Sequence, residues 1–168
     1  MKLELYTDGG CRGNGQNLNA PAGIGCVLLI PDEEPIYFKQ TLKFSPNTNN
    51  KAEIYAMTRG IDLIFKYYKS AQDFENSKNF VKDELIIYSD SNYTIQGISN
   101  WIDGWRANGW MTTSKTPVKN QELWVDLDNR LLFLKNYFDI KFVKVKGHAG
   151  NQWNEVCDQL ANAAMDEL

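Results

Sequence analysis

Residues 23–30 read GIGCVLLI and form the middle one of three apolar runs that decide the fold. The first run covers residues 3–8 and the third covers residues 36–44, and Gly/Asn-rich and PDEEP segments separate the three. Aliphatic and aromatic runs bounded by such turn residues are typical of β-strands joined as hairpins. We therefore expect three consecutive antiparallel strands in the first third of the chain.

After this unit, helical and strand patterns alternate. Residues 84–89 and 140–145 are short β-rich runs, residues 92–109 predict short helices broken by glycines, and a last helix begins near Asn151. Two longer helices, residues 50–69 and 124–138, show apolar side chains at steps of three and four, namely Ile54, Met57, Ile61, Phe65 and Tyr68, then Trp124, Leu127, Leu131, Leu134 and Phe138. The pair Asn49 and Asn50 offers an N-cap for the first of them, with Glu53 in its first turn.

This order of elements predicts an α/β fold. Three antiparallel strands are followed by two strands that each come after a helix, which favours a mixed five-stranded sheet, three strands antiparallel and two parallel, flanked by helices. With 168 residues, 43% of them hydrophobic, the chain fits a single domain over residues 1–168. The polar segment 70–83 is interpreted as a surface connection.

Composition excludes several classes of protein. No apolar stretch is long enough to cross a membrane and the N-terminus does not resemble a signal peptide, so we expect a soluble, cytoplasmic protein. Three cysteines and one histidine favour neither a disulfide framework nor a zinc site. The net charge of −3 excludes a global basic field, so any polyanion must be held by local features. A monomer without an obligate protein partner is the default expectation.

Four carboxylates lie at positions where catalytic residues are often found. Asp8 and Asp90 are expected at strand ends, Glu53 on the first long helix and Asp158 on the last one. Asp90 is the clearest case because ligands of open α/β sheets bind at the carboxyl ends of strands. Asp8 shares a pleat face with Glu4 and Tyr6, so it could instead point to solvent. If the carboxylates converge, their repulsion requires bound cations, and oxygen ligands favour Mg²⁺ or Mn²⁺.

Six strings occur in the order and spacing of a known family. They are YTDGGCRGNG, TNNKAEIYA, YSDSNYTIQGI, NWIDGWRANGW, PVKNQELW and VKGHAGNQWNEVCDQLA, and they span nearly the whole chain. Together they resemble the successive motifs of type 1 ribonuclease H, the ribonuclease HI family. The resemblance implies the ribonuclease H-like fold and an endoribonuclease that cuts the RNA strand of RNA/DNA hybrids, leaving 3′-hydroxyl and 5′-phosphate ends.

The resemblance also implies a role for each carboxylate. In the family, two divalent cations, Mg²⁺ with Mn²⁺ as a substitute, activate water and stabilise the leaving 3′-oxygen. Asp8 matches the ligand shared by both ions, Glu53 and Asp90 complete one site, and Asp158 completes the other. His148, in KGHAGN, matches a residue that assists proton transfer or product release; without the surrounding motif, a lone surface histidine without a role is the alternative.

The substrate contacts implied by the family fall on loops and helix ends. Asn14 and the backbone at Cys11 and Gly13 match a loop that follows 2′-hydroxyls in the minor groove, and Asn92 matches another position facing the substrate. Asn49 and Asn50 match minor-groove contacts, although they also suit helix caps. Contacts to the DNA strand are implied for Thr48 and Asn120, which match a phosphate pocket, and for Trp101 together with Thr113. Trp105 and Trp110 are interpreted as packing residues.

The chain departs from its relatives in its basic residues. Pro46 stands where family members have a cation near the phosphate pocket, and residues 101–120 contain only Arg106, Lys115 and Lys119. Because phosphate neutralisation supplies much of the affinity for nucleic acids, we expect weaker hybrid binding than in strongly basic relatives, with a smaller dependence on salt. Lys141, Lys144 and Lys146 add positive potential near the site or simply solvate an edge strand.

Two other functions share some of these features. A DNA-acting member of the same superfamily, such as a transposase or junction resolvase, would use the same carboxylates, but it has no need of the GGCRGNG loop or the tryptophan-rich segment. A non-catalytic module that binds hybrids would have no need of all four carboxylates and His148. Cleavage tests on RNA paired with DNA, paired with RNA and single-stranded separate these possibilities.

Overall fold

The computed structural model describes residues 1–13, 20–44, 47–68, 73–74, 82–147 and 150–168. Its centre is a five-stranded sheet in the order β3-β2-β1-β4-β5, formed by β1 (Lys2–Cys11), β2 (Ala22–Leu29), β3 (Ile36–Leu42), β4 (Asp83–Ser89) and β5 (Phe138–Lys144). β1, β2 and β3 pair antiparallel, whereas β4 pairs parallel with both β1 and β5. The predicted mixed sheet is confirmed.

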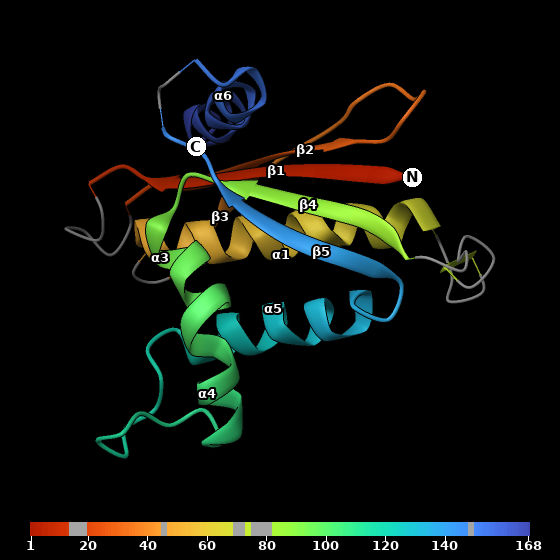
Figure 1. Ribbon diagram of the computed structural model, residues 1–168. Coiled ribbons are helices and arrows are strands. Elements are labelled where there is room, and N and C mark those ends of the chain that lie inside the picture. Colours follow the sequence, from red (N-terminus) through yellow and green to blue (C-terminus); the bar gives the residue numbers. More distant parts are fainter. Residues whose placement is uncertain (14–19, 45–46, 69–72, 75–81, 148–149) are drawn as a thin grey trace.

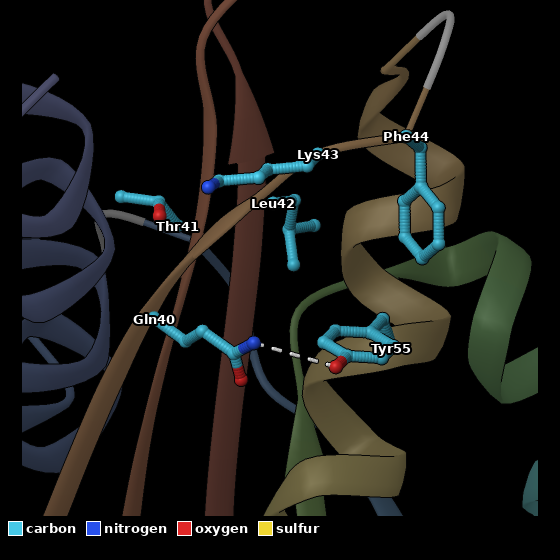
Figure 2. Close-up of a pocket in the computed structure, with 6 residues that line it drawn as sticks. All are labelled: Gln40, Thr41, Leu42, Lys43, Phe44 and Tyr55. Atoms are coloured by element: carbon cyan, nitrogen blue, oxygen red, sulfur yellow. Dashed lines mark hydrogen bonds between the residues drawn. The ribbon is translucent and has the colours of Figure 1, made fainter.

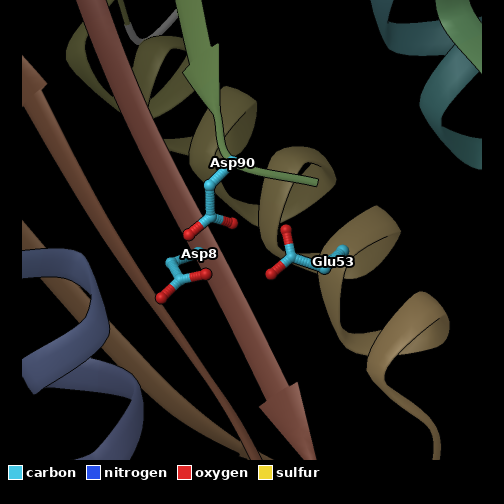
Figure 3. A group of neighbouring side chains, drawn as sticks. All are labelled: Asp8, Glu53 and Asp90. Atoms are coloured by element: carbon cyan, nitrogen blue, oxygen red, sulfur yellow. The ribbon is translucent and has the colours of Figure 1, made fainter. Parts of the chain in front are cut away.

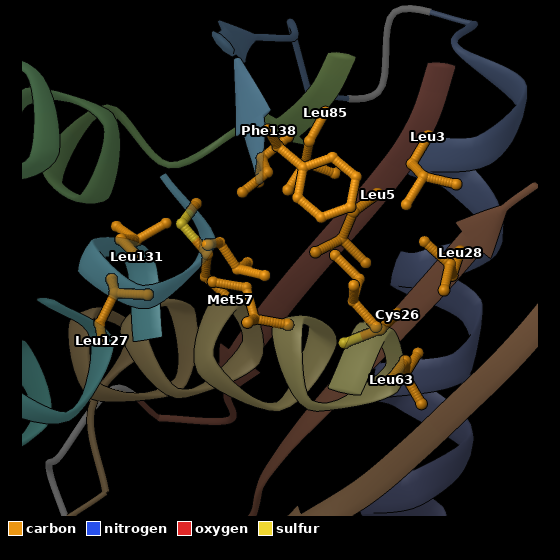
Figure 4. Packing of buried hydrophobic residues seen from close by; sticks show 14 of the residues in the cluster. Leu3, Leu5, Cys26, Leu28, Met57, Leu63, Leu85, Leu127, Leu131 and Phe138 are labelled. Carbon is orange, nitrogen blue, oxygen red and sulfur yellow. The ribbon is translucent and has the colours of Figure 1, made fainter. Parts of the chain in front are cut away.

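Helices cover both faces of this sheet (Figure 1). On one side lie α1 (Asn49–Tyr68) and α5 (Gln121–Leu134), and on the other side α6 (Gln152–Asp166) packs on β2 and β1. Leu3 and Leu5 of β1, Leu85 of β4 and Met57 of α1 are fully buried between the sheet and α1, in the cluster shown in Figure 4. This core fixes α1 against the sheet and thereby places Glu53.

The start of α1 differs from the prediction. Thr48, and not Asn49 or Asn50, acts as the N-cap, since its Oγ1 accepts the Lys51 N–H at 3.1 Å. Asn49 is already helical and its Oδ1 accepts the Cys11 N–H at 2.7 Å. Glu53 therefore lies beyond the first turn, which contains no acidic residue. Its carboxylate is directed to the sheet, so an interaction with the helix dipole does not explain its position.

Two other segments also differ from the pattern. The helix predicted over residues 124–138 ends at Leu134, and Phe138 begins β5. Residues 92–107 form α3 (Asn92–Gln96), the π-helical turn η1 (Gly97–Trp101) and α4 (Ile102–Ala107) without a break at a glycine. Gly97 serves packing, because a Cβ there would lie 2.2 Å from the Trp124 ring. The last helix begins after Asn151, as predicted, with the Asn151 side chain accepting the Asn154 N–H.

Candidate active site

Asp8, Glu53 and Asp90 come together at one end of the sheet (Figure 3). Each offers one carboxylate oxygen to a group whose members all lie within 4.8 Å of one another. Asp8 and Asp90 are neighbours because β1 and β4 are parallel and pair Thr7 with Ser89. Asp8 is 5% exposed, so the possibility that it points to solvent is wrong. Asp158 of α6 lines the same hollow as these three residues.

Glu53 is held in place by hydrogen bonds from two strands. Its Oε1 accepts the Gly9 N–H at 2.9 Å, and its Oε2 accepts the Ser89 hydroxyl at 3.4 Å. The approach of β1 to α1 requires a glycine at position 9, since a Cβ would lie 2.4 Å from the Ala52 carbonyl group. The glycine of the YTDGG string thus lets β1 reach the helix that carries Glu53.

Burial and mutual repulsion disfavour the charged forms of these acids. The pKa of Asp8 lies far above its ordinary value because the carboxyl group is desolvated and faces Glu53, Asp90 and Asp158. Desolvation also raises the pKa of Glu53, while hydrogen bonds from Asp8, Gly9 and Ser89 partly offset that rise. A site that concentrates carboxylate oxygens and resists their ionisation is stabilised by a cation, and the hard oxygen ligands fit a divalent ion such as Mg²⁺.

Asp90 has a further contact from the other face of the sheet. Asn154, 3% exposed near the start of α6, points its Nδ2 to Asp90 Oδ2 at 3.5 Å. A Cβ at Gly147 would lie 3.3 Å from the same oxygen. The chain before His148 therefore runs directly past Asp90, while His148 itself lies outside the described residues, as does Asn14.

The predicted substrate residues divide into two groups. Asn49, Asn50 and Asn92 line the same hollow as the four carboxylates, together with Gly9, Ser91 and Tyr93, which sequence reasoning missed. The remaining ones, Cys11, Gly13, Thr48, Trp101, Thr113 and Asn120, do not line it. Tyr93 follows Asp90 by three residues within the string YSDSNYTIQGI, and the sequence carries no separate signal for its place in the hollow.

Tyr93 connects the hollow with the tryptophan-rich segment. Its hydroxyl accepts the Asn120 amide at 3.3 Å and the Trp124 Nε1–H at 3.2 Å, and its ring centroid lies 6.2 Å from that of Trp101. Trp101 is 40% exposed, whereas Trp105 packs on Trp124 at 5.3 Å. Trp105 and Trp110 pack against the core, as expected, while a contact of Trp101 with DNA stays a prediction.

Arg106 has a structural partner. Its Nε and NH2 donate to the two oxygens of Asp128 at 2.8 and 2.7 Å, and NH2 also reaches Asp103 at 3.1 Å. Asp128 is 3% exposed, so the guanidinium compensates a buried charge on α5. The charge of Arg106 is already paired within the fold, so Arg106 is less available to a polyanion than an unpaired arginine would be.

A second hollow lies apart from the carboxylates, between β3 and α1 (Figure 2). Lys43, Phe44 and Tyr55 line it together with Gln40, Thr41 and Leu42. Gln40 Nε2 donates to the Tyr55 hydroxyl at 3.4 Å. The described residues that line it include no carboxylate, and none of them also lines the acidic hollow.

Solved structures with a similar fold show the fold class to which this chain belongs. The crystal structure of LC9-RNase H1, a type 1 RNase H with the type 2 active-site motif, matches with a TM-score of 0.72 at 22% identity, covering 99% of this chain and 72% of that one. LC11-RNase H1 in complex with an RNA/DNA hybrid matches with a TM-score of 0.66 at 20% identity, covering 98% and 97%. The fold is therefore ribonuclease H-like.

Sequence comparisons identify the family to which the chain belongs. The RNase H family model matches residues 1–166. The ribonuclease H of Clostridium botulinum is 41% identical, covering 99% of this chain and 97% of the relative, and that of Treponema denticola is 36% identical, covering 100% and 99%. The chain belongs to the ribonuclease H family and is a metal-dependent hydrolase, an endoribonuclease acting on RNA/DNA hybrids. None of the described helices is long and apolar enough to span a membrane.

Proposed function

We propose that this chain hydrolyses the RNA strand of RNA/DNA hybrids with two Mg²⁺ ions held by Asp8, Glu53, Asp90 and Asp158, leaving 3′-hydroxyl and 5′-phosphate ends. The observation that carries the proposal is the group of carboxylates from β1, α1 and the end of β4, with their oxygens within 4.8 Å. Mg²⁺ at such a site supplies Lewis-acid stabilisation of phosphate oxygens and an activated water. Mn²⁺, which also prefers oxygen ligands, is expected to substitute.

The protein's own part in the reaction is to hold charge in fixed positions. Asp8 and Glu53 are buried and Asp90 is partly buried, and their oxygens are brought together before any substrate arrives. Glu53 cannot turn away from the group without losing the Gly9 and Ser89 hydrogen bonds. Preorganised groups of this kind need little rearrangement during reaction, which is the main source of electrostatic catalysis. Gly147 beside Asp90 supports His148 as an assistant in proton transfer or product release.

The asparagines beside the carboxylates suit the recognition of RNA. Asn49, Asn50 and Asn92 line the hollow, and an amide both donates and accepts hydrogen bonds, as a 2′-hydroxyl requires. The Asn49–Cys11 hydrogen bond holds the end of β1 against α1 at this place, and Gly13, with φ of 84°, turns the chain just beyond it. We propose that this edge, extended by Asn14, follows the minor groove of the hybrid.

The DNA strand is proposed to lie on the side of Tyr93 that faces away from the carboxylates, where Asn120 contacts it. Asn120 touches Tyr93 and adopts a left-handed backbone with φ of 60°, and the hydroxyl of Thr48 can donate to a phosphate while its oxygen caps α1. Exposed Trp101 offers an aromatic surface to the strand, with exposed Thr113 on the same segment. Because Arg106 is paired with Asp128, we expect weaker binding than in strongly basic relatives and a smaller salt dependence.

The test is cleavage of an end-labelled RNA that is paired with DNA, paired with RNA, or single-stranded, with Mg²⁺ and with EDTA. Metal-dependent cutting of the DNA-paired RNA alone is the expected result. Asp8→Asn should lose cleavage but keep hybrid binding, since the substitution removes a charge and preserves shape. Cleavage of DNA alone, binding without cleavage, or full activity of Asp8→Asn at saturating Mg²⁺ would each overturn the assignment.

A further inference from the structure

Ser89 ends β4 immediately before Asp90, and its side chain is fully buried. Its Oγ lies 3.4 Å from Glu53 Oε2 and 3.1 Å from the backbone nitrogen of Ser91. One hydroxyl thus connects the acid on α1 with the turn that carries Asp90. None of the family motifs quoted above assigns a function to this position.

The direction of these hydrogen bonds follows from the chemistry of the groups. The Ser91 N–H can only donate, so it occupies a lone pair of the Ser89 oxygen. The hydroxyl then has one proton to donate, and Glu53 Oε2 is the acceptor within reach. The bonds therefore run from Ser91 to Ser89 and from Ser89 to Glu53. A serine that is satisfied in this way has no alternative orientation of equal energy.

Glu53 is consequently gripped from two neighbouring strands. Gly9 N–H of β1 donates to Oε1, and Ser89 of β4 donates to Oε2. Because Gly9 binds one oxygen and Ser89 the other, a rotation of the carboxylate about its last bond weakens at least one of these two contacts. Since Ser89 is adjacent to Asp90 in the chain, any shift of the turn moves both acids together.

We propose that Ser89 is a positioning residue for the metal site, and that its hydroxyl fixes the Glu53 carboxylate in the orientation that a divalent cation needs. The inference rests on the proposed site at Asp8, Glu53 and Asp90. Partners that orient metal-binding carboxylates typically contribute tenfold to hundredfold to metal affinity. At 3.4 Å the Ser89–Glu53 contact is long, so an effect of about tenfold is expected.

The neighbouring strand provides a matched control. Thr7 pairs with Ser89 in the register of β1 and β4, is 1% exposed, and has a buried hydroxyl oxygen without a hydrogen-bond partner among the described residues. Thr7→Val removes a hydroxyl at the same depth and preserves the shape of the side chain. Ser89→Ala removes the hydroxyl that donates to Glu53. The two variants therefore separate loss of a buried hydroxyl from loss of the contact with the acid.

The experiment is calorimetric titration of Mg²⁺ and of Ca²⁺ into the whole protein without nucleic acid, with urea unfolding in EDTA as a check on folding. Ser89→Ala should bind Mg²⁺ about tenfold more weakly than the wild type. Its affinity for Ca²⁺ should fall less, because Ca²⁺ tolerates irregular geometry and Mg²⁺ does not. Thr7→Val should bind both ions as the wild type does, and Ser89→Thr, which retains the hydroxyl, should recover Mg²⁺ affinity.

Cleavage provides a second readout. Ser89→Ala should need a higher Mg²⁺ concentration for half-maximal cleavage and should approach wild-type kcat once the ion saturates. If its Mg²⁺ affinity equals that of the wild type while Asp8→Asn loses binding, the role of Ser89 is refuted and the metal site stands. Equal weakening in Thr7→Val would also refute it. If the wild type itself binds no Mg²⁺, both the metal site and the inference fall.

Discussion

Replacing Asp8 with Asn should make the metal-free protein more stable, although the same change should abolish catalysis. Asp8 is buried within 4.8 Å of oxygens of Glu53 and Asp90. Asn has nearly the same shape, carries no charge, and can still donate a hydrogen bond to Glu53. The wild type must therefore hold a proton on Asp8 to avoid a repulsion that the variant lacks, and the difference in stability should disappear when a cation neutralises the group.

The size of the effect follows from distance and from pH. If Asp8 were ionised, its charge and that of a neighbouring carboxylate, no more than 4.8 Å apart, would repel by at least about 3.5 kcal/mol at an effective dielectric constant near 20. The pKa of Asp8 is raised in the folded state, so from about pH 4 upward the folded protein holds a proton that the unfolded chain has lost. Its free energy of unfolding then falls as pH rises, by up to about 1.4 kcal/mol per pH unit. Between pH 5 and pH 7 the advantage of Asp8→Asn should therefore grow by up to about 2.7 kcal/mol.

The assay is urea unfolding of both proteins in EDTA at several pH values, repeated with saturating Mg²⁺. Asp139→Asn on β5, where the side chain is exposed, controls for the change in net charge. Mg²⁺ should stabilise the wild type and leave Asp8→Asn nearly unchanged, because ligands stabilise only the state that binds them. Parallel pH profiles for wild type and variant, or a less stable variant at pH 7 in EDTA, would refute the electrostatic argument.

Three further predictions test the surroundings of the site. Arg106→Lys keeps the charge but loses the forked contact with buried Asp128, so it should lower the free energy of unfolding in urea by about 2 kcal/mol, and an unchanged free energy of unfolding would show that the fork is not needed. Trp101→Ala, at a side chain that is 40% exposed, should weaken hybrid binding by about 1–3 kcal/mol with little change in the urea midpoint, whereas a large loss of stability would identify a packing residue. His148→Ala should lower turnover without abolishing it, and a folded but fully inactive variant would contradict an assisting role.

The sequence predicted the sheet because its signals are local. Alternating runs and turn residues mark the strands, and the steps from Ile54 to Tyr68 mark α1, whose bounds the structure gives as Asn49–Tyr68. The end of α5 was harder, since Phe138 continues the helical step from Leu134 but is 2% exposed as the first residue of β5. Apolar spacing alone does not distinguish a fourth helical turn from the beginning of a strand.

The site was predictable only where the chain marks it with unusual residues. Asp90 stands out because it directly follows β4, and Asp8 could be named after an apolar run, although β1 continues past it to Cys11 and the prediction that Asp8 ends the strand was wrong. The support of Glu53 by Ser89 and the pairing of Arg106 with Asp128 could not, because they join residues 36 and 22 positions apart. Such contacts depend on how elements pack against one another, and a common residue type gives no local signal for them.

The parallel pairing of β1 with β4 also determines when this site can exist during folding. Asp8 and Asp90 become neighbours only after β1 has paired with β4, and β2, β3 and α1 lie between these two strands in the sequence. Long-range parallel pairings form slowly, because the loop entropy is lost before the contacts are gained. A chain still emerging from the ribosome holds these acids apart until β4 has been made, and Asp158 arrives later still. A cation that needs oxygens from all these acids would therefore bind only after the sheet has formed, and would stabilise the completed fold.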